Sequence, residues 1–169
     1  ELVKDLFVFS CFTGLSYSDM KGLKNSNIQD FFDGNRWIIV RRKKTATSSN
    51  VMLLDIPKMI IEKYAGLSKD GKVFPVPSNT ICNDSLKRIS QLIDCLVEKK
   101  VTFHLARHTF ATLFLSEGVP LESLSKMLGH KNIATTQIYA KILNEKVGKD
   151  MQKVSNKFKG LEQSFVSQL

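Results

Sequence analysis

Residues 104–112 read His104-Leu105-Ala106-Arg107-His108-Thr109-Phe110-Ala111-Thr112, and this stretch decides which fold the chain is expected to have. Side chains three and four residues apart are neighbours on a helix, so His104, Arg107 and His108 are expected on one face. Two histidines at this spacing can share a zinc ion, but the glutamate of the metalloprotease pattern is missing and Arg107 would add a fixed positive charge. An imidazole and a guanidinium together suit a phosphate, because both can donate hydrogen bonds to its oxygens. The stretch therefore favours a phosphate site without a metal.

Two shorter motifs follow downstream. In Leu128-Gly129-His130, the glycine permits a sharp helix stop that presents His130 at the helix end. Thr135-Thr136-Gln137-Ile138-Tyr139 comes next. All three histidines of the chain fall between positions 104 and 130, and this crowding is the first indication of a functional site.

These three motifs, in this order and spacing, closely resemble the tyrosine recombinases, the lambda-integrase-like enzymes of phages and mobile elements. The resemblance covers nearly the whole chain and leaves only the tail weakly covered. It implies that Tyr139 is the nucleophile and that His104, Arg107 and His130 contact the scissile phosphate. The tyrosine would displace a 5′ oxygen and leave a 3′-phosphotyrosyl bond, which another strand's 5′ hydroxyl reverses. The bond energy is stored, so neither ATP, a metal nor another cofactor is implied.

A lysine between the second and third strands protonates the leaving oxygen in this family. Lys44, in Arg41-Arg42-Lys43-Lys44-Thr45, matches that position, and its neighbour Lys43 is the rival assignment. Any single lysine in this loop can also serve only to attract the DNA backbone.

The first catalytic arginine of the family is missing. It usually follows Thr-Gly-Leu, and here Thr13-Gly14-Leu15 is followed by Ser16. Losing a guanidinium from the phosphate clamp can cost orders of magnitude in rate. Ser16 with Tyr17-Ser18-Asp19 is similar to the integrases of Bacteroides-type conjugative transposons, which are active despite the change. The alternative is a decayed enzyme that still binds DNA, against which the remaining intact site residues argue.

Arg42 is the replacement that we expect for the missing arginine. Residues i and i+2 project from one face of a strand, so Arg42 could approach the phosphate beside Lys44, while Arg41 would point away. The alternative is that Arg42 only holds the DNA backbone. Asp19 resembles the acidic residue that supports the family's site, and it could equally be the N-cap of the next short helix.

Other residues near the motifs are interpreted as structural. His108 is expected to be satisfied by backbone groups rather than to act in catalysis. Trp37 is expected to pack in a hairpin. Phe110, Leu113 and Phe114 follow at helical spacing and are expected in the core.

The remaining pattern predicts a mainly α fold with a small three-stranded antiparallel β-sheet (α+β), which agrees with the tyrosine recombinase catalytic domain. Apolar spacing indicates helices at residues 2–12, 57–67, 79–99, 104–117, 121–128 and 135–146, with a further helix start signal at Ser18-Asp19. Strands are expected at residues 27–32, 36–42 and 51–56, and an extended connector at residues 72–78.

Length and composition indicate one domain with a polyanionic partner. With 169 residues and 43% hydrophobic content, the chain fits a single catalytic domain over residues 1–169, with a polar tail from about residue 148. The net charge of +9 favours double-stranded DNA over an anionic membrane surface. The longest apolar run, residues 6–12, is too short to span a bilayer, and no secretory signal is visible. Cys11, Cys82 and Cys95 are expected to be reduced core thiols, so a cytoplasmic location is expected.

Several expectations concern the whole protein. The chain lacks an initiator Met, which suggests a fragment without the family's N-terminal DNA-clamping domain. The resemblance implies a homotetramer on two DNA sites at full length, with a fragment that could be monomeric, and accessory DNA-bending proteins as further partners. The tail, residues 148–169, could pass to a neighbouring subunit or fold back on its own domain. A non-cleaving DNA-binding accessory protein and a related DNA-relaxing topoisomerase remain as alternatives.

Overall fold

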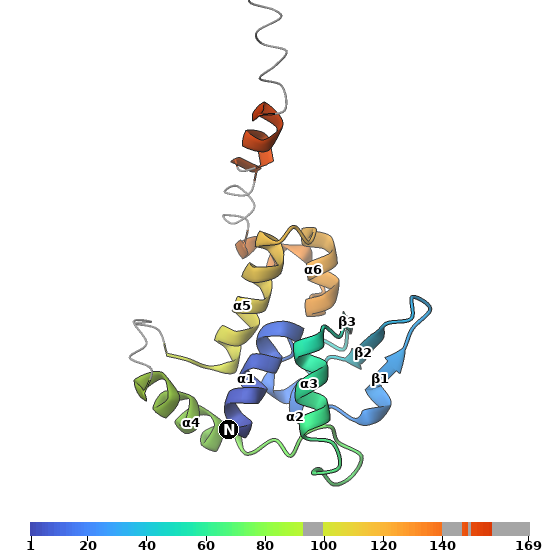
Figure 1. The fold of residues 1–169 in the computed structure, drawn as a ribbon, viewed down its shortest axis with the longest axis vertical. Helices are drawn as coiled ribbons and strands as arrows, with labels where there is room; N and C mark the ends of the chain where they lie inside the picture. Colours follow the sequence, from blue (N-terminus) through green and yellow to red (C-terminus); the bar gives the residue numbers. More distant parts are fainter. Residues whose placement is uncertain (93–99, 140–146, 149, 157–169) are drawn as a thin grey trace, which may run out of the picture.

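The computed structural model describes residues 1–92, 100–139, 147–148 and 150–156. Within these ranges the chain is mainly helical with a three-stranded antiparallel sheet of order β1-β2-β3, which confirms the predicted fold class (Figure 1). The helices are α1 (Leu2–Thr13), α2 (Tyr17–Gly22), α3 (Asp55–Lys63), α4 (Asn79–Leu92), α5 (Phe103–Ser116) and α6 (Leu121–Leu128). The strands are β1 (Ile28–Asp30), β2 (Arg36–Arg41) and β3 (Ser48–Met52), and the 3-10 helices are η1 (Asn25–Asn27), η2 (Ile133–Thr135) and η3 (Gln137–Tyr139).

Helix α1 packs against α3, α4 and α5 and lies at the centre of the domain (Figure 1). It contributes Phe9, which is fully buried, to a first hydrophobic cluster shared with α2, α3, α4 and the sheet. A second cluster joins α5 and α6 and includes Phe110, Leu128 and Tyr139. Because Tyr139 belongs to this second cluster, the packing of α5 against α6 fixes the place of the tyrosine.

Two glycines end α1 and α6, as the sequence predicts. Gly14 has φ 67° and Gly129 has φ 60°, a left-handed conformation that favours glycine. A Cβ atom at Gly14 would lie 2.6 Å from the Phe110 ring, and one at Gly129 would lie 2.7 Å from Cγ of Arg42. Each helix therefore stops abruptly and leaves its last carbonyl groups without partners inside the helix.

The third strand and the helix after it differ from the prediction. Strand β3 covers Ser48–Met52 instead of residues 51–56, because the ladder to β2 is formed by backbone groups whatever the side chains are. The buried hydroxyl of Ser49 donates to the carbonyl of Met127, which satisfies this polar side chain. Helix α3 then begins at Asp55, so Pro57 is its third residue and not its first. Proline is tolerated there because N–H groups of the first turn have no partner inside the helix.

Other boundaries are partly confirmed. Helix α6 has the predicted bounds, α1 ends one residue later than predicted, and α5 begins and ends one residue earlier than predicted. The helix predicted at residues 135–146 is wrong as far as residue 139, because η2 and η3 replace it, and residues 140–146 lie outside the described residues. Helix α4 is described to Leu92, and its predicted continuation to residue 99 also lies outside.

The tail is described in part. Residues 147–148 and 150–156 are helical, with Val154 42% exposed. The other apolar positions of the predicted tail face, Phe158, Leu161, Phe165 and Val166, lie outside the described residues.

The residues predicted to be structural are placed as follows. Trp37 packs against Phe31 with ring centroids 5.6 Å apart, which confirms its packing role. Phe110 is fully buried, but Leu113 is 36% exposed and is therefore not a core residue.

Two of the three cysteines can be compared with the prediction. Cys11 is half-buried and Cys82 is buried, both are free, and Cys95 lies outside the described residues. Burial raises the pKa of the Cys11 thiol to about 11. Within the described part of the chain, none of the helices has the length and apolar character needed to cross a membrane.

Candidate active site

Arg107 is held by the ends of two helices. It lies on α5, whose first turn is capped by the Thr102 side chain. Its Nη1 donates to the carbonyl of Gly14 at the end of α1, at 2.5 Å, and its Nη2 donates to the carbonyl of Leu128 at the end of α6, also at 2.5 Å. Helix C-termini carry partial negative charge, so they favour a guanidinium at this point. Arg107 is thus fixed by main-chain groups.

Arg42 reaches the same place from the sheet. Its side chain is buried, and its Nη1 donates to the Leu128 carbonyl at 2.6 Å. Its Nε lies 2.7 Å from Oδ2 of Asp19, which is also buried. Burial lowers the pKa of Arg42, and the Asp19 charge opposes this shift. Burial and the neighbouring charge of Arg42 lower the pKa of Arg107 to about 10, which still leaves the Arg107 guanidinium charged at neutral pH.

The prediction that Arg42 and Lys44 share one strand face is wrong. Strand β2 ends at Arg41, and residues 43–45 form a turn. Arg41 is exposed, as predicted, and its Nε donates to the carbonyl of Ala46. Arg42 therefore enters the site because the chain turns after β2, and the strand alternation does not explain it.

Ser16 and Asp19 form one unit at the start of α2. The Ser16 hydroxyl accepts from the Asp19 N–H at 3.3 Å and donates to its Oδ2 at 2.6 Å. The N-cap of α2 is thus Ser16, and the prediction that Asp19 could be the cap is wrong, because Asp19 is the third residue of the helix. Asp19 instead supports Arg42 through the ion pair.

His130 follows the Gly129 stop and joins the arginine cluster. Its Nε2 lies 3.1 Å from Nη2 of Arg107 and its Nδ1 lies 2.8 Å from Oγ1 of Thr136. A guanidinium can only donate, so Nε2 accepts and Nδ1 carries the proton that is donated to Thr136. Burial, together with the charges of Arg107 and Arg42, lowers the pKa of His130 to about 4. This imidazole is therefore neutral at physiological pH.

Tyr139 is joined to the histidines of α5. Its phenol oxygen lies 2.7 Å from Nδ1 of His108, and Nε2 of His108 lies 2.8 Å from Nε2 of His104. Only 8% of Tyr139 is exposed, and this burial raises its pKa while the charge of Arg107 opposes the shift. The structure therefore brings Tyr139, His104, Arg107 and His130 into one cluster.

His108 belongs to the cluster, which the sequence did not predict. The prediction assigned it to backbone partners, whereas both of its ring nitrogens contact side chains of the cluster. The available signal was its place on the same helical face as His104 and Arg107. The missing information was the position of η3, which brings Tyr139 over that face.

The two loop lysines have different surroundings. The Lys43 side chain packs beside Gly22, and its backbone N–H donates to Oδ1 of Asp19 at 3.4 Å. Lys44 is exposed in the turn between β2 and β3. In the described ranges, no hydrogen bond or ion pair links Lys44 to the cluster. The structure thus leaves the Lys44 amine available at the loop tip.

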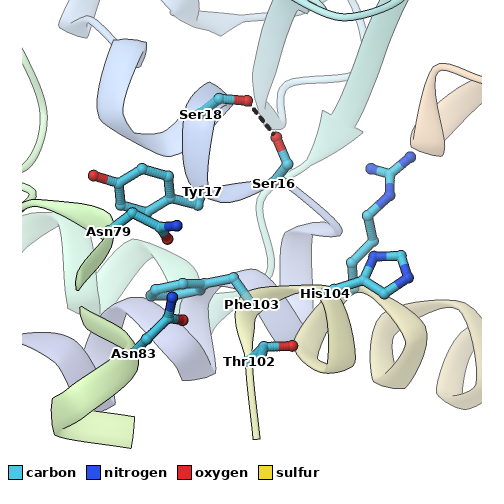
Figure 2. Close-up of a pocket in the computed structure, with 9 residues that line it drawn as sticks. Ser16, Tyr17, Ser18, Asn79, Asn83, Thr102, Phe103 and His104 are labelled. Carbon is cyan, nitrogen blue, oxygen red and sulfur yellow. Dashed lines mark hydrogen bonds between the residues drawn. The ribbon is translucent and has the colours of Figure 1, made fainter. Parts of the chain in front are cut away.

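A pocket of about 430 Å³ opens beside the cluster. Its lining residues come from α2, α4 and α5 and the residues just before α2 and α5: Ser16, Tyr17, Ser18, Asn79, Asn83, Thr102, Phe103, His104 and Arg107. Figure 2 shows Asn79 and Asn83 at one end of the pocket and His104 at the other. The polar side chains of this lining include several hydrogen-bond donors and no carboxylate, so the pocket suits an anionic, phosphate-bearing ligand.

Metal binding has no support in the described residues. No group of three or more His, Cys, Asp or Glu side chains there could hold a metal ion. The pair of His104 and His108 lies beside Arg107, whose positive charge disfavours a cation.

The chain is thus a helical domain with a small sheet in which a tyrosine is gathered with histidines and arginines. The chain belongs to the phage integrase family, whose sequence pattern matches residues 4–146.

Known proteins agree with this assignment. The tyrosine recombinase XerA of Saccharolobus solfataricus is 34% identical over 117 residues, which is 69% of this chain and 38% of that protein. XerH site-specific recombinase, in a post-cleavage complex with palindromic difH substrate, has a TM-score of 0.69 at 20% identity over 88% of this chain and 44% of that one. The Tn1549 transposon integrase bound to transposon right end DNA has a TM-score of 0.65 at 21% identity over 80% and 53%. The chain spans between 38% and 54% of the length of four curated relatives that it matches.

Proposed function

We propose that this chain is the catalytic domain of a site-specific recombinase that cuts and rejoins DNA through a 3′-phosphotyrosyl bond on Tyr139. The observation that carries the proposal is the cluster in which Arg107 is held at the ends of α1 and α6 beside His130. The Tyr139 phenol is linked to His104 through His108. The net charge of +9 supports double-stranded DNA as the partner.

In this proposal Tyr139 attacks phosphorus and the 5′ oxygen of the next nucleotide leaves. Arg107, His104 and His130 hold the nonbridging oxygens, and each such donor stabilises the pentavalent state by about 3 kcal/mol. His130 accepts from Arg107 in the DNA-free structure, so donation to phosphate requires a proton on Nε2. The incoming negative charge favours that protonated form.

Lys44 is proposed to protonate the leaving 5′ oxygen. Its support is the exposed position of Lys44 in the β2–β3 turn, whereas the Lys43 side chain packs beside Gly22 at the end of α2. Rejoining reverses the steps, with a 5′ hydroxyl as the attacking group. No cofactor takes part in this scheme.

Arg42 is proposed to supply the charge that Ser16 does not. Support comes from the Leu128 carbonyl, which accepts from both Arg42 and Arg107. Because Arg42 is buried and tied to Asp19, it acts by placing positive charge behind Arg107. Ser16 and the residues after it further favour an integrase of a Bacteroides-type conjugative transposon, and the likeness to the Tn1549 integrase fits a transposon origin.

The proposal extends to the assembly. The pocket beside His104 is proposed to hold the backbone of the cleaved strand, and the full-length protein is proposed to act as a homotetramer on two DNA sites in the cytoplasm. Accessory DNA-bending proteins and exchange of the tail between subunits belong to the same scheme. The isolated domain would then bind DNA weakly and in a salt-sensitive way, because it neutralises few phosphates.

Covalent capture tests the proposed chemistry and selects the DNA target in the same step. The chain is incubated at low salt with a pool of nicked duplexes that have randomised arms and a 5′-bridging phosphorothiolate at the nick. Adducts are separated on a denaturing gel and sequenced. Wild type should give an adduct band with enriched arms, and Tyr139→Phe should give none. DNA binding without an adduct would contradict the proposal and favour a non-cleaving DNA-binding protein, the alternative that Ser16 supports.

A further inference from the structure

The structure contains a continuous line of hydrogen bonds that the proposed chemistry does not yet use. It runs from the Tyr139 oxygen to Nδ1 of His108, at 2.7 Å, and from Nε2 of His108 to Nε2 of His104, at 2.8 Å. The His104 and His108 rings meet edge-on with centroids 4.3 Å apart. His104 in turn lines the open pocket beside Arg107. The line therefore connects the buried nucleophile to the place where phosphate would bind.

The protonation states along this line are mutually consistent. A neutral phenol donates its O–H to Nδ1 of His108, which requires the proton of His108 to lie on Nε2. That N–H then donates to Nε2 of His104. Each bond thus has one donor and one acceptor, and a proton can move along the line without any ring turning over.

We propose that His108 is the catalytic base for Tyr139, taking the phenolic proton at Nδ1 during attack and passing its Nε2 proton to His104. This inference rests on the proposed strand cleavage and names a further residue of that same site. The Tyr139 O–H bond breaks as the O–P bond forms, and the P–O5′ bond breaks with its electron pair on the 5′ oxygen. In rejoining, the proton returns along the same line to the departing phenolate.

The charged and titratable neighbours of Tyr139 favour His108 for this task. Arg107 can only donate, and both nitrogens of His130 are engaged by Arg107 and Thr136. His104 connects with the phenol through His108. A proton that arrives on His104 also places positive charge at the pocket while negative charge builds on the phosphate.

The test uses single-turnover adduct formation on 5′-bridging phosphorothiolate DNA, with sequences taken from the covalent capture. A thiolate leaves without needing a proton, so the reaction of wild type on this substrate does not depend on the group that protonates the leaving oxygen. His108→Ala should be slower by about 100-fold or more, as expected for loss of a general base. Its rate should also rise about tenfold per pH unit between about pH 6 and pH 8, because hydroxide must then remove the proton.

A second variant separates proton transfer from positioning. The side-chain oxygen of His108→Asn can accept the Tyr139 hydrogen bond but cannot take up a proton. Adduct formation by His108→Asn should therefore remain slow and keep the steep pH dependence. Thr112→Ala, one turn further along α5, is the matched control and should react like wild type. A His108→Asn rate within about threefold of wild type would overturn the inference, since general bases contribute far more.

Failure of the inference differs from failure of the proposed function. If wild type gives no adduct, strand cleavage itself is wrong. If wild type reacts and His108→Ala reacts equally well, only the role of His108 is wrong. A measurement without DNA covers the case in which the His108→Ala chain does not fold. In wild type, 15N NMR should show that Nδ1 of His108 is an unprotonated acceptor, and its signal should change in Tyr139→Phe. A protonated Nδ1 would contradict the inference.

Discussion

Arg42 and Arg107 donate to the same oxygen atom, the carbonyl of Leu128, at 2.6 and 2.5 Å. Two like charges this close repel each other, which contributes to the lowered pKa of Arg107. The carboxylate of Asp19 offsets part of this repulsion through its ion pair with Arg42. The pair gives the site a concentrated positive charge without an arginine at position 16.

The role of Arg42 can be tested by relocation of the charge. Arg42→Ala should lower the cleavage rate by about 100-fold while DNA affinity changes only a few fold, because loss of one preorganised positive charge behind Arg107 weakens the stabilisation of the negative charge that develops on the phosphate. Adding Ser16→Arg to Arg42→Ala should restore at least about a tenth of the lost rate, since Ser16 lines the same pocket as Arg107. Rates come from adduct gels and affinities from fluorescence anisotropy.

Two controls accompany this comparison. Arg41→Ala removes an exposed arginine next to Arg42, at the end of β2, and should weaken binding without a separate effect on cleavage. Arg42→Ala leaves the buried carboxylate of Asp19 without its partner, which can destabilise the fold. The double variant Arg42→Ala with Asp19→Asn removes this charge, so a slow rate in the double variant is not caused by unfolding. Equal losses of binding and cleavage in Arg42→Ala would show that it only holds DNA.

Gly129→Ala should destabilise the fold more than Gly34→Ala does. Both glycines have positive φ, so both substitutions carry a backbone strain of about 1 kcal/mol. Only at Gly129 would the new Cβ collide with Arg42 and approach Ser49, whereas nothing lies within 4 Å at Gly34. Overpacking adds about 1 to 3 kcal/mol. Urea unfolding measures both variants, and equal free energies of unfolding would contradict the close packing at the end of α6.

His130 makes the stability of the DNA-free chain depend on pH. Its pKa is about 4 in the folded chain and near the ordinary 6.5 in the unfolded chain, so the unfolded chain binds more protons between these values. The contribution of His130 to the free energy of unfolding is fully present above pH 6.5 and falls as the pH drops toward 4. Thermal unfolding should show a shallower decrease over this window in His130→Gln than in wild type. An equal decrease of the unfolding temperature with falling pH in His130→Gln and wild type would contradict a buried neutral imidazole at His130.

The pocket beside the cluster can be tested with added negative charge. Asn83→Asp lies in the pocket lining and should weaken DNA binding by at least about tenfold, through repulsion of the backbone phosphates. Asn50→Asp carries the same change on the exposed side of β3 and should have a smaller effect. Anisotropy titrations at two salt concentrations compare them. Equal effects would mean that DNA does not enter this pocket.

The sequence was sufficient for most helices because their apolar spacing is strong. The bounds of α6 are those predicted, and Gly14 and Gly129 end their helices as expected. It was insufficient for β3, where pairing with β2 overrides the polar character of Ser48 to Asn50. The sequence also did not predict the contacts between segments that lie far apart in the chain. The place of His108 depends on η3, and the place of Arg42 depends on the turn after β2 and on the end of α6.

The main-chain carbonyls of Gly14 and Leu128 orient Arg107 whatever side chains those positions carry. Point substitutions cannot delete a carbonyl, so this support of Arg107 is robust to mutation as long as the two helix ends keep their paths. A side chain such as that at position 16 has no such protection. Under the proposed function, the frame that orients Arg107 would therefore outlast the loss of an arginine elsewhere in the site.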